Sequence, residues 1–298
     1  MINSSVVLIT FKRPKETKKI YKIISKVKPK KIYIFQDGYD NSFSKNEEKK
    51  FFETKKFITD LKSKKIKKIF FKKNIGLRYI AFNILKIVFR SENKIIIIED
   101  DTMPKISFFK YCDIMLKKYS FNKKIAQISG CNLYYGINKK QITKDSYIFS
   151  KYPQIWGWAT WRDRWQKYYD PDIKSWPKKR NSFLRKKNLR NGEKRYLKFV
   201  LDKTYSKIGQ GWDQQWIYAC IQNDLKTIVP SKNLIKNIGF KNNPAGKSAR
   251  KFRNLFFEDI KFPIKHPRRT SNSEIYDRFL YLNFYNRKFI LKRMINKV

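Results

Sequence analysis

The stretch IIIIEDDTMP, residues 95 to 104, joins four consecutive isoleucines to three consecutive acids. A short, fully apolar run of β-branched residues is typical of a strand that is buried on both faces of a parallel sheet. Ligands of open α/β sheets bind outside the carboxyl ends of such strands. Glu99, Asp100 and Asp101 therefore follow a buried strand at a place where a site is expected, in a chain with 70 Lys and Arg against 24 Asp and Glu.

Comparable apolar runs recur along the first half of the chain, with segments of helical length between them. They lie at residues 6–9, 32–35, 69–71 and 125–128. This spacing indicates parallel strands with helical crossovers. Apolar residues at helical spacing predict helices over 77–88, with Asn74 as N-cap, and over 107–119. A helix over 213–222 and a strand over 226–229 are expected to return to the sheet. The sequence predicts an α/β fold with a mostly parallel open sheet and flanking helices.

The composition of the 298 residues indicates a folded protein, because 41% are apolar and 16% aromatic. The formal net charge of +46 favours polyanionic partners such as nucleic acid, an anionic membrane or a phosphorylated substrate. Lys is spread almost evenly along the chain, so a compositional bias explains the same charge. A surface of solvated lysines needs no ligand.

The cysteine pattern indicates a reducing compartment. Cys112, Cys131 and Cys220 lack the paired short spacings of zinc sites and disulfide frameworks. The first apolar run is too short for a signal sequence, and no window approaches the length of a membrane span. We expect a soluble protein, or at most a peripheral one. The single histidine, His266, has no second ligand at metal-binding spacing, so we expect a loop role or a substrate contact.

The residues that follow the apolar runs are candidates for a nucleotide site. Mg²⁺ and Mn²⁺ take oxygen ligands, often one or two carboxylates together with substrate phosphates, which the block 99–101 can supply. These acids can also cap a helix or pair with lysines. Arg13 suits a phosphate or an ordinary surface position, and Asp37 suits a base, a ribose or a plain Asp-Gly turn. Gly76 allows either close approach of a ligand to the backbone or a positive φ.

The composition changes after about residue 150, where Trp, Tyr and Pro become frequent. Five of the seven Trp residues lie between Trp156 and Trp176, and aromatic loops of this kind close over a ligand or pack on a sheet. The stretch GWDQQW places Asp213 between two tryptophans. A carboxylate in such a pocket suits a general base, and it equally suits a helix N-cap.

The ordered motifs resemble those of the GT-A nucleotide-diphospho-sugar transferases. The resemblance is to bacterial HlpA-like sugar transferases and, more distantly, to N-acetylglucosaminyltransferase I. It covers about residues 5 to 240. The motifs are VVLITFKRP, IFQDGYD, NIGLRYIAFNILK, IIIIEDDTMPKISFFKY, ISGCN, IWGWATWRDRW, GWDQQW and IVPSKNLIKNIGF.

The resemblance implies a site and a mechanism. Asp101 would ligate Mn²⁺ or Mg²⁺, and Asp100 and Glu99 would face the ribose and the donor sugar. Asp213 would be the base of an inverting single displacement, although the Trp-Asp-Asp-Trp of the eukaryotic relatives is Trp-Asp-Gln-Gln-Trp here. The remaining donor-side candidates are Thr10, Arg13, Asp37, Asn74, Gly76, Arg78 and Tyr79. The acceptor-side candidates are Trp156, Trp158 and Trp212.

The expected domain organisation is a GT-A domain over 1–240 and a basic C-terminal extension over 241–298. Residues 1–130 would bind the nucleotide-sugar and 131–240 the acceptor. The segment from Asp277 onward alternates basic and aromatic residues and is expected to be amphipathic.

The predicted function is metal-dependent transfer of a hexosyl or N-acetylhexosaminyl group, from a UDP-sugar in preference, to a glycan or lipid-linked glycan. The expected setting is bacterial lipopolysaccharide or glycan biosynthesis, in the cytoplasm or at the inner face of the membrane. One alternative is a sugar nucleotidyltransferase, which would carry a glycine-rich loop where this chain has TFKRPKE. Another is a nucleic-acid-binding protein, which would concentrate its basic residues on one recognisable module.

Overall fold

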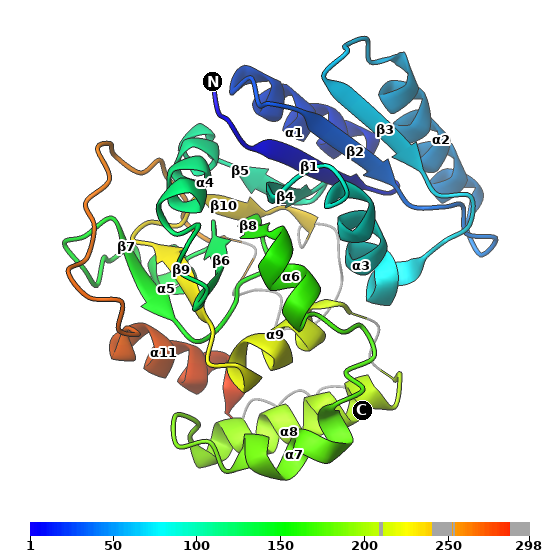
Figure 1. The fold of residues 1–298 in the computed structure, drawn as a ribbon. Coiled ribbons are helices and arrows are strands. Elements are labelled where there is room, and N and C mark those ends of the chain that lie inside the picture. The colour runs from blue at the N-terminus through cyan, green and yellow to red at the C-terminus, as the bar shows by residue number, and fades with distance from the viewer. Residues whose placement is uncertain (209–210, 240–251, 253, 287–298) are drawn as a thin grey trace.

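An eight-stranded, mostly parallel sheet forms the centre of the structure, with strand order β3-β2-β1-β4-β8-β6-β9-β7 (Figure 1). The computed structural model describes residues 1–208, 211–239, 252 and 254–286. Strands β1 to β4 pair in parallel, as do β6 and β9, whereas β8 runs antiparallel between β4 and β6, and β7 runs antiparallel to β9. The predicted α/β fold with a mostly parallel open sheet is confirmed.

The strands of the central sheet are β1 Ser5–Thr10, β2 Ile32–Gln36, β3 Ile66–Phe70, β4 Lys94–Glu99, β6 Ile125–Ser129, β7 Tyr147–Ser150, β8 Trp158–Trp161 and β9 Lys226–Pro230. A second, two-stranded sheet pairs β5 Thr102–Pro104 with β10 Ile235–Asn237. The α-helices are α1 Pro14–Lys26, α2 Lys45–Asp60, α3 Gly76–Val88, α4 Ile106–Lys118, α5 Leu133–Asn138, α6 Arg162–Tyr168, α7 Trp176–Leu184, α8 Asn191–Tyr205, α9 Asp213–Gln222 and α11 Glu274–Leu280, and a π-helical segment, η2, follows at Tyr281–Tyr285.

Each apolar run in the first half of the sequence forms a strand, and the third strand begins earlier than predicted, at Ile66. The predicted helix at 107–119 is α4, and the predicted helix and strand at 213–229 are α9 and β9. The predicted N-cap Asn74 is wrong. Helix α3 begins at Gly76 and has Ile75 at its N-cap position.

Alternate residues of the central strands divide the core between the two faces of the sheet. Val6 and Leu8 of β1 pack in a cluster with residues of α1, α2 and α4. Val7 packs on the other face, in a cluster with residues of α3, α6 and α9. Full burial of such a side chain contributes roughly 1.5–3 kcal/mol. The period of two along each strand therefore fixes which helices cover which face.

The described part of the predicted C-terminal extension packs on the rest of the chain. Ile260 lies in the core cluster of α1 and α4. Tyr276 and Leu280 of α11 lie in a third cluster with residues of α5, α7 and α8. Of the segment predicted to be amphipathic, residues 277–286 lie within this packed part, and residues 287–298 lie outside the described residues.

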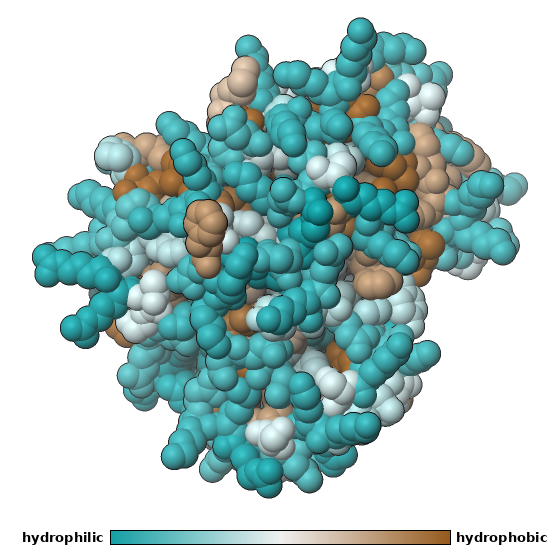
Figure 2. Space-filling view, viewed as in Figure 1, coloured by the Kyte–Doolittle hydropathy of each residue, from teal (hydrophilic) through white to brown (hydrophobic). Residues whose placement is uncertain are grey.

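Hydrophilic side chains cover most of the face visible in Figure 2. Within the part of the chain that the structure describes, no helix combines the length and apolar character needed to cross a membrane.

Candidate functional site

The candidate site lies where the carboxyl ends of β1 and β4 meet. The chain leaves β1 toward β2 and β3 on one side and returns to β4 on the other. Such a reversal of strand order opens the crevice in which α/β sheets bind ligands. Arg13 follows β1, and the acids 99–101 end β4, so both predicted groups lie at this point.

Asp100 binds Arg13 and the backbone beside it. Its Oδ1 accepts a hydrogen bond of 2.6 Å from Arg13 Nη1, and its Oδ2 accepts one of 3.0 Å from the Phe11 amide. Burial raises the pKa of Asp100 to about 6, although Arg13 opposes this shift. Asp100 is 3% exposed and both of its oxygens accept hydrogen bonds within the protein, so it fixes the guanidinium of Arg13. Its contact with a ribose stays a prediction.

Asp101 has a buried carboxylate oxygen, Oδ1, without a hydrogen-bond partner among the described residues. The other oxygen, Oδ2, lies 3.4 Å from Arg13 Nη2. The backbone of Asp101 is held by the two-stranded sheet, because the Ile238 amide donates to its carbonyl at 2.7 Å. Burial raises the pKa of Asp101, and Arg13 lowers it. A buried oxygen without a partner is costly unless a ligand or cation completes it.

Glu99 and Asp213 lie within electrostatic range of each other although they are far apart in the sequence. Burial raises the pKa of Glu99 to about 8, with further upward contributions from Asp101, Asp100 and Asp213 and a downward one from Arg13. Asp213 is the first residue of α9, Trp212 is its N-cap, and the Gln214 side chain donates to Asp213 Oδ2 at 2.8 Å. Burial raises the pKa of Asp213. The alternative that Asp213 is a plain N-cap is therefore wrong.

The acids fit a cation that brings most of its own ligands. No group of three or more His, Cys, Asp or Glu side chains in the described residues is arranged to hold a metal ion by itself. Mg²⁺ and Mn²⁺ at nucleotide sites use one or two carboxylates plus phosphates and water. Asp101 with its unpaired Oδ1, together with Glu99, matches that smaller requirement.

Asp37 caps helix α3. Its Oδ1 accepts hydrogen bonds from the amides of Gly38 and Ile75, both at 2.8 Å, and its Oδ2 accepts one from the Gly76 amide at 3.2 Å. Gly76 has a φ of +75°, so the positive-φ alternative for this glycine is correct. Asn74, which was expected to cap the helix, donates to the Gly38 carbonyl at 3.4 Å instead. A carboxylate satisfies these amides better than an amide side chain, because it also stabilises the positive end of the helix dipole.

Thr10 and His266 both form hydrogen bonds within the protein. Thr10 is buried, and its hydroxyl donates to the Phe35 carbonyl at 2.9 Å. Its contact with the sugar donor stays a prediction. A hydrogen bond of 2.9 Å joins Nδ1 of His266 to Oη of Tyr147, in agreement with a structural role in a loop.

Arg78 and Tyr79, the donor-side candidates on α3, both contact Asp172. Tyr79 Oη donates to Asp172 Oδ1 at 2.9 Å, and Arg78 Nη2 lies 3.8 Å from the same oxygen. Arg78 is buried. The sequence prediction missed Asp172. The only signal was a second Asp in YYDPDIK, within the segment where aromatic residues become frequent.

Two of the acceptor-side tryptophans are core residues. Trp158 is 1% exposed and packs against Trp165, Trp212 and Trp216. Trp212 is buried in the same cluster. Their rings are buried against one another, so the expectation that they line an acceptor surface was wrong for both. Trp156 is half-buried and packs edge-on to Phe252 at 5.1 Å, and its acceptor role stays a prediction.

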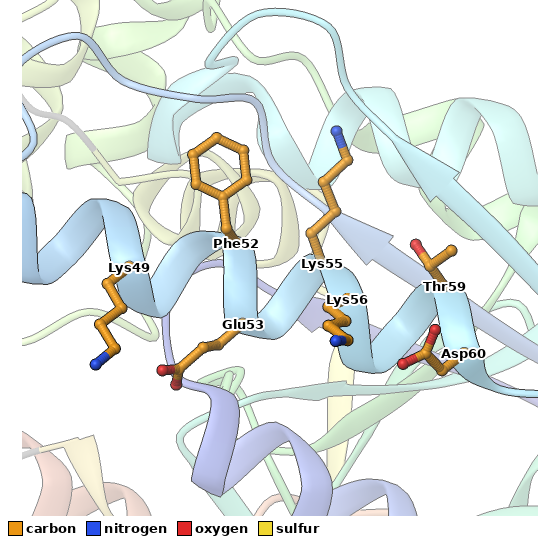
Figure 3. A pocket seen from close by; sticks show the side chains of 7 residues that line it. All are labelled: Lys49, Phe52, Glu53, Lys55, Lys56, Thr59 and Asp60. Carbon is orange, nitrogen blue, oxygen red and sulfur yellow. The ribbon is translucent and has the colours of Figure 1, made fainter.

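Two surface hollows of the described residues lie away from the candidate site. One, of about 580 Å³, lies on the outer face of α2, where Phe52 and Lys55 project on one side of the helix and Lys49 and Glu53 on the other (Figure 3). Another, of about 490 Å³, lies between β7 and residues 267–273. Neither is lined by the acids of the candidate site.

Comparison with known proteins gives weak structural likenesses. No family model matches the sequence, and no curated protein matches it. Among solved structures, the chain is similar to GalNAc-T7 with UDP, GalNAc and Mn²⁺, at 10% identity and a TM-score of 0.42, over 77% of this chain and 43% of that one. The chain therefore spans less than half the length of that protein.

The chain is also similar to UDP-glucose pyrophosphorylase complexed with UDP-glucose, at 9% identity and a TM-score of 0.37, over 80% of this chain and 94% of that one. A third similar structure is mouse xyloside xylosyltransferase 1, at 11% identity and a TM-score of 0.33, over 75% of this chain and 82% of that one. All three TM-scores are below 0.5, so these likenesses do not indicate the function of the chain.

Proposed function

We propose that this chain is a divalent-cation-dependent glycosyltransferase that moves a sugar from a nucleoside-diphosphate sugar, UDP-linked in our expectation, to a glycan or lipid-linked glycan. The observation that carries the proposal is the unpaired, buried Oδ1 of Asp101 at the β1–β4 switch point, beside Arg13. A cation bound there would offset the clustered negative charge and attract an anionic diphosphate, which suits a protein that is basic elsewhere.

The residues of the site divide into separate roles. Asp101 would hold the cation, with Glu99 as a second carboxylate. Arg13, fixed by Asp100, is placed to contact a phosphate oxygen, because guanidinium groups match phosphates in geometry and charge. A bound Mn²⁺ or Mg²⁺ would neutralise the charge that builds on the leaving diphosphate.

Asp213 is the residue proposed to accept a proton. The acceptor hydroxyl oxygen forms the new bond to the anomeric carbon, the bond from that carbon to the diphosphate oxygen breaks, and its electron pair leaves with the diphosphate. The hydroxyl proton passes to the Asp213 carboxylate. Burial raises the pKa of Asp213 above its ordinary value, which makes the carboxylate a stronger base than an exposed one.

A sugar nucleotidyltransferase is the nearest alternative activity. The structure places Phe11, Lys12 and Arg13 directly after β1, and α1 begins at Pro14. No glycine-rich loop stands between them to wrap the phosphates of a nucleoside triphosphate. This connection favours the transferase.

Thermal unfolding tests the proposal without knowledge of the acceptor. Wild type, Asp101→Ala and the exposed control Asp60→Ala are heated with UDP, GDP, CDP, ADP or CMP, each with and without Mn²⁺. A ligand at about 100 times its Kd stabilises the native state by about 2.7 kcal/mol. We expect one nucleoside diphosphate to raise the Tm of wild type and Asp60→Ala only with Mn²⁺, and Asp101→Ala to lose the effect. If no nucleotide raises the Tm of wild type, the proposal is wrong.

A further inference from the structure

Residues 169–175, which we call the linking segment, join α6 to α7 and are anchored on α9. Tyr169 Oη donates to the Trp212 carbonyl at 3.3 Å, directly before α9. Gln215 Nε2 donates to the Pro171 carbonyl at 3.2 Å, and the hydroxyls of Ser175 and Tyr218 are 2.9 Å apart. Three contacts along seven residues fix the path of this segment beside the helix that begins with Asp213.

The linking segment also holds Asp172 in one orientation. Asp170 Oδ1 accepts a hydrogen bond of 3.0 Å from the Asp172 amide, and Asp170 Oδ2 accepts one of 2.8 Å from the Lys174 amide. A carboxylate that bonds amides two and four residues later stabilises a tight turn. The Asp172 carboxylate is thereby directed toward α3.

Asp172 meets Arg78 and Tyr79 at the first turn of α3. Its Oδ1 accepts the 2.9 Å hydrogen bond from Tyr79 Oη and lies 3.8 Å from Arg78 Nη2. The Arg78 side chain is only 9% exposed, whereas Asp172 is 31% exposed, so the pair lies at the edge of the protein interior. A guanidinium with a fixed partner loses less conformational freedom when it binds an anion than a free one does.

Arg78 lies close to the residues proposed for catalysis. Burial raises the pKa of Tyr169, Asp213 raises it further, and Arg78 lowers it. The cation from α3 and the carboxylate from α9 therefore act on one phenol of the linking segment. Asp37, directly after β2, caps the start of α3, so Arg78 lies at the same carboxyl edge of the sheet as Arg13 and Asp101.

We propose that Asp172 is a positioning residue that holds Arg78, with Tyr79, for contact with an anionic group of a nucleoside-diphosphate donor. The inference rests on the proposed function. Asp172 acts through Arg78 and does not itself contact the donor, because its Oδ1 already accepts from Tyr79 and its carboxylate would repel phosphate.

The test is a binding cycle on the intact chain, with Mn²⁺ and the nucleoside diphosphate that stabilises wild type. We expect Asp172→Asn to raise the Kd about tenfold, because the amide keeps an oxygen for Tyr79 but loses the charge that orients Arg78. Arg78→Gln should raise the Kd at least as much. The Kd of the double variant should be no higher than that of Arg78→Gln, since Asp172 acts on the donor only through Arg78.

Tyr79→Phe and Asp60→Asn complete the test. Tyr79→Phe removes only the hydrogen bond to Asp172 and should raise the Kd about threefold. This variant keeps the proposal testable if Asp172→Asn folds poorly. Asp60→Asn removes an exposed carboxylate on α2 and should bind as wild type does.

An unchanged Kd in Asp172→Asn overturns the inference even if the variant melts earlier, because that pattern is purely structural. Fully additive effects of Asp172→Asn and Arg78→Gln overturn it as well. If wild type itself binds no nucleoside diphosphate, the proposed function fails, and this inference fails with it.

Discussion

The three consecutive acids at the end of β4 have three different environments. Asp100 bonds Arg13 and a backbone amide, Asp101 keeps one buried oxygen unpaired, and burial together with the neighbouring acids raises the pKa of Glu99 to about 8. One guanidinium, that of Arg13, thus acts on three carboxyl groups, of which Asp100 is buried and Glu99 and Asp101 are partly buried. A local excess of buried negative charge is unfavourable by itself and is typical of a functional site.

Gly239 lies so close to Asp101 that a side chain has no room. A Cβ at this position would lie 2.6 Å from Asp101 Oδ2, closer than real Cβ atoms approach. We expect Gly239→Ala to displace the carboxylate and to weaken Mn²⁺-dependent nucleotide binding about tenfold, while the carboxyl group itself remains. Isothermal titration with and without Mn²⁺ measures this effect. Unchanged binding would show that the position of the Asp101 carboxylate is not critical.

Asp213→Asn separates catalysis from donor binding. The amide is nearly isosteric but cannot take the acceptor proton, so we expect kcat for sugar transfer to fall about 100-fold or more. The Kd of the nucleoside diphosphate should change by less than about twofold, since Asp213 has no proposed contact with it. The rate of sugar transfer is measured as release of the nucleoside diphosphate in the presence of an acceptor. Equal kcat values in the variant and wild type would exclude Asp213 as the base.

At the scale of elements, the start of α3 depends on Asp37 rather than on a neighbouring residue. Asp37→Ala removes the acceptor for the amides of Ile75 and Gly76. We expect it to lower the free energy of unfolding by about 1–2 kcal/mol, as the loss of a helix cap does. Asn74→Ala, at the position that the sequence suggested as the cap, should change it by less than about 0.5 kcal/mol. Urea unfolding of both variants measures the difference, and equal losses would contradict it.

The strands were predictable from the sequence, because an uninterrupted apolar run such as residues 95–98 is typical of a strand that is buried on both faces. The cap of α3 was not, because Asp37 reaches Ile75 across 38 residues, and local sequence shows only an Asn at the right spacing. The same limit applies to Asp172, whose partners lie on another helix. Trp158 and Trp212 were misassigned because an aromatic core cluster and an aromatic ligand surface have the same composition.

Asp277 joins α11 to the end of β7. Its Oδ1 accepts a hydrogen bond of 2.6 Å from Ser150 Oγ, and burial raises its pKa to about 6. The Asp277 carboxyl group therefore binds a proton more tightly in the folded state than in the unfolded chain. The stabilisation that this proton gives is lost as pH rises from about 4 through 6. The stability of wild type relative to Asp277→Asn should fall by on the order of 2 kcal/mol over that range.

Urea unfolding at pH 4.5 and pH 7 measures the Asp277 effect. Asp60→Asn, which changes an exposed carboxylate, is the control and should show no comparable pH dependence relative to wild type. A stability difference between wild type and Asp277→Asn that stays constant over this range would exclude the proton as its cause.

The charge of the whole molecule sets how stability responds to salt. With a formal charge of +46, repulsion between like charges outweighs the attraction within the ion pairs of the described residues. Several of those ion pairs are partly buried. Screening acts mainly on exposed charges, because the Debye length is about 10 Å at 0.1 M salt and buried pairs are screened less. Net repulsion should therefore weaken as salt is added.

We expect the Tm of the metal-free protein to rise between about 20 mM and 200 mM NaCl. The triple variant Lys62→Glu, Lys64→Glu and Lys65→Glu, at three exposed positions before β3, lowers the net charge and should give a smaller rise. Thermal unfolding of both proteins along one salt series measures the slopes. A Tm that is flat or falls with salt would mean that ion pairs, rather than lysine repulsion, dominate the electrostatic energy. The charge would then not limit the stability of the fold, and selection for an anionic partner would become the better explanation of so basic a surface.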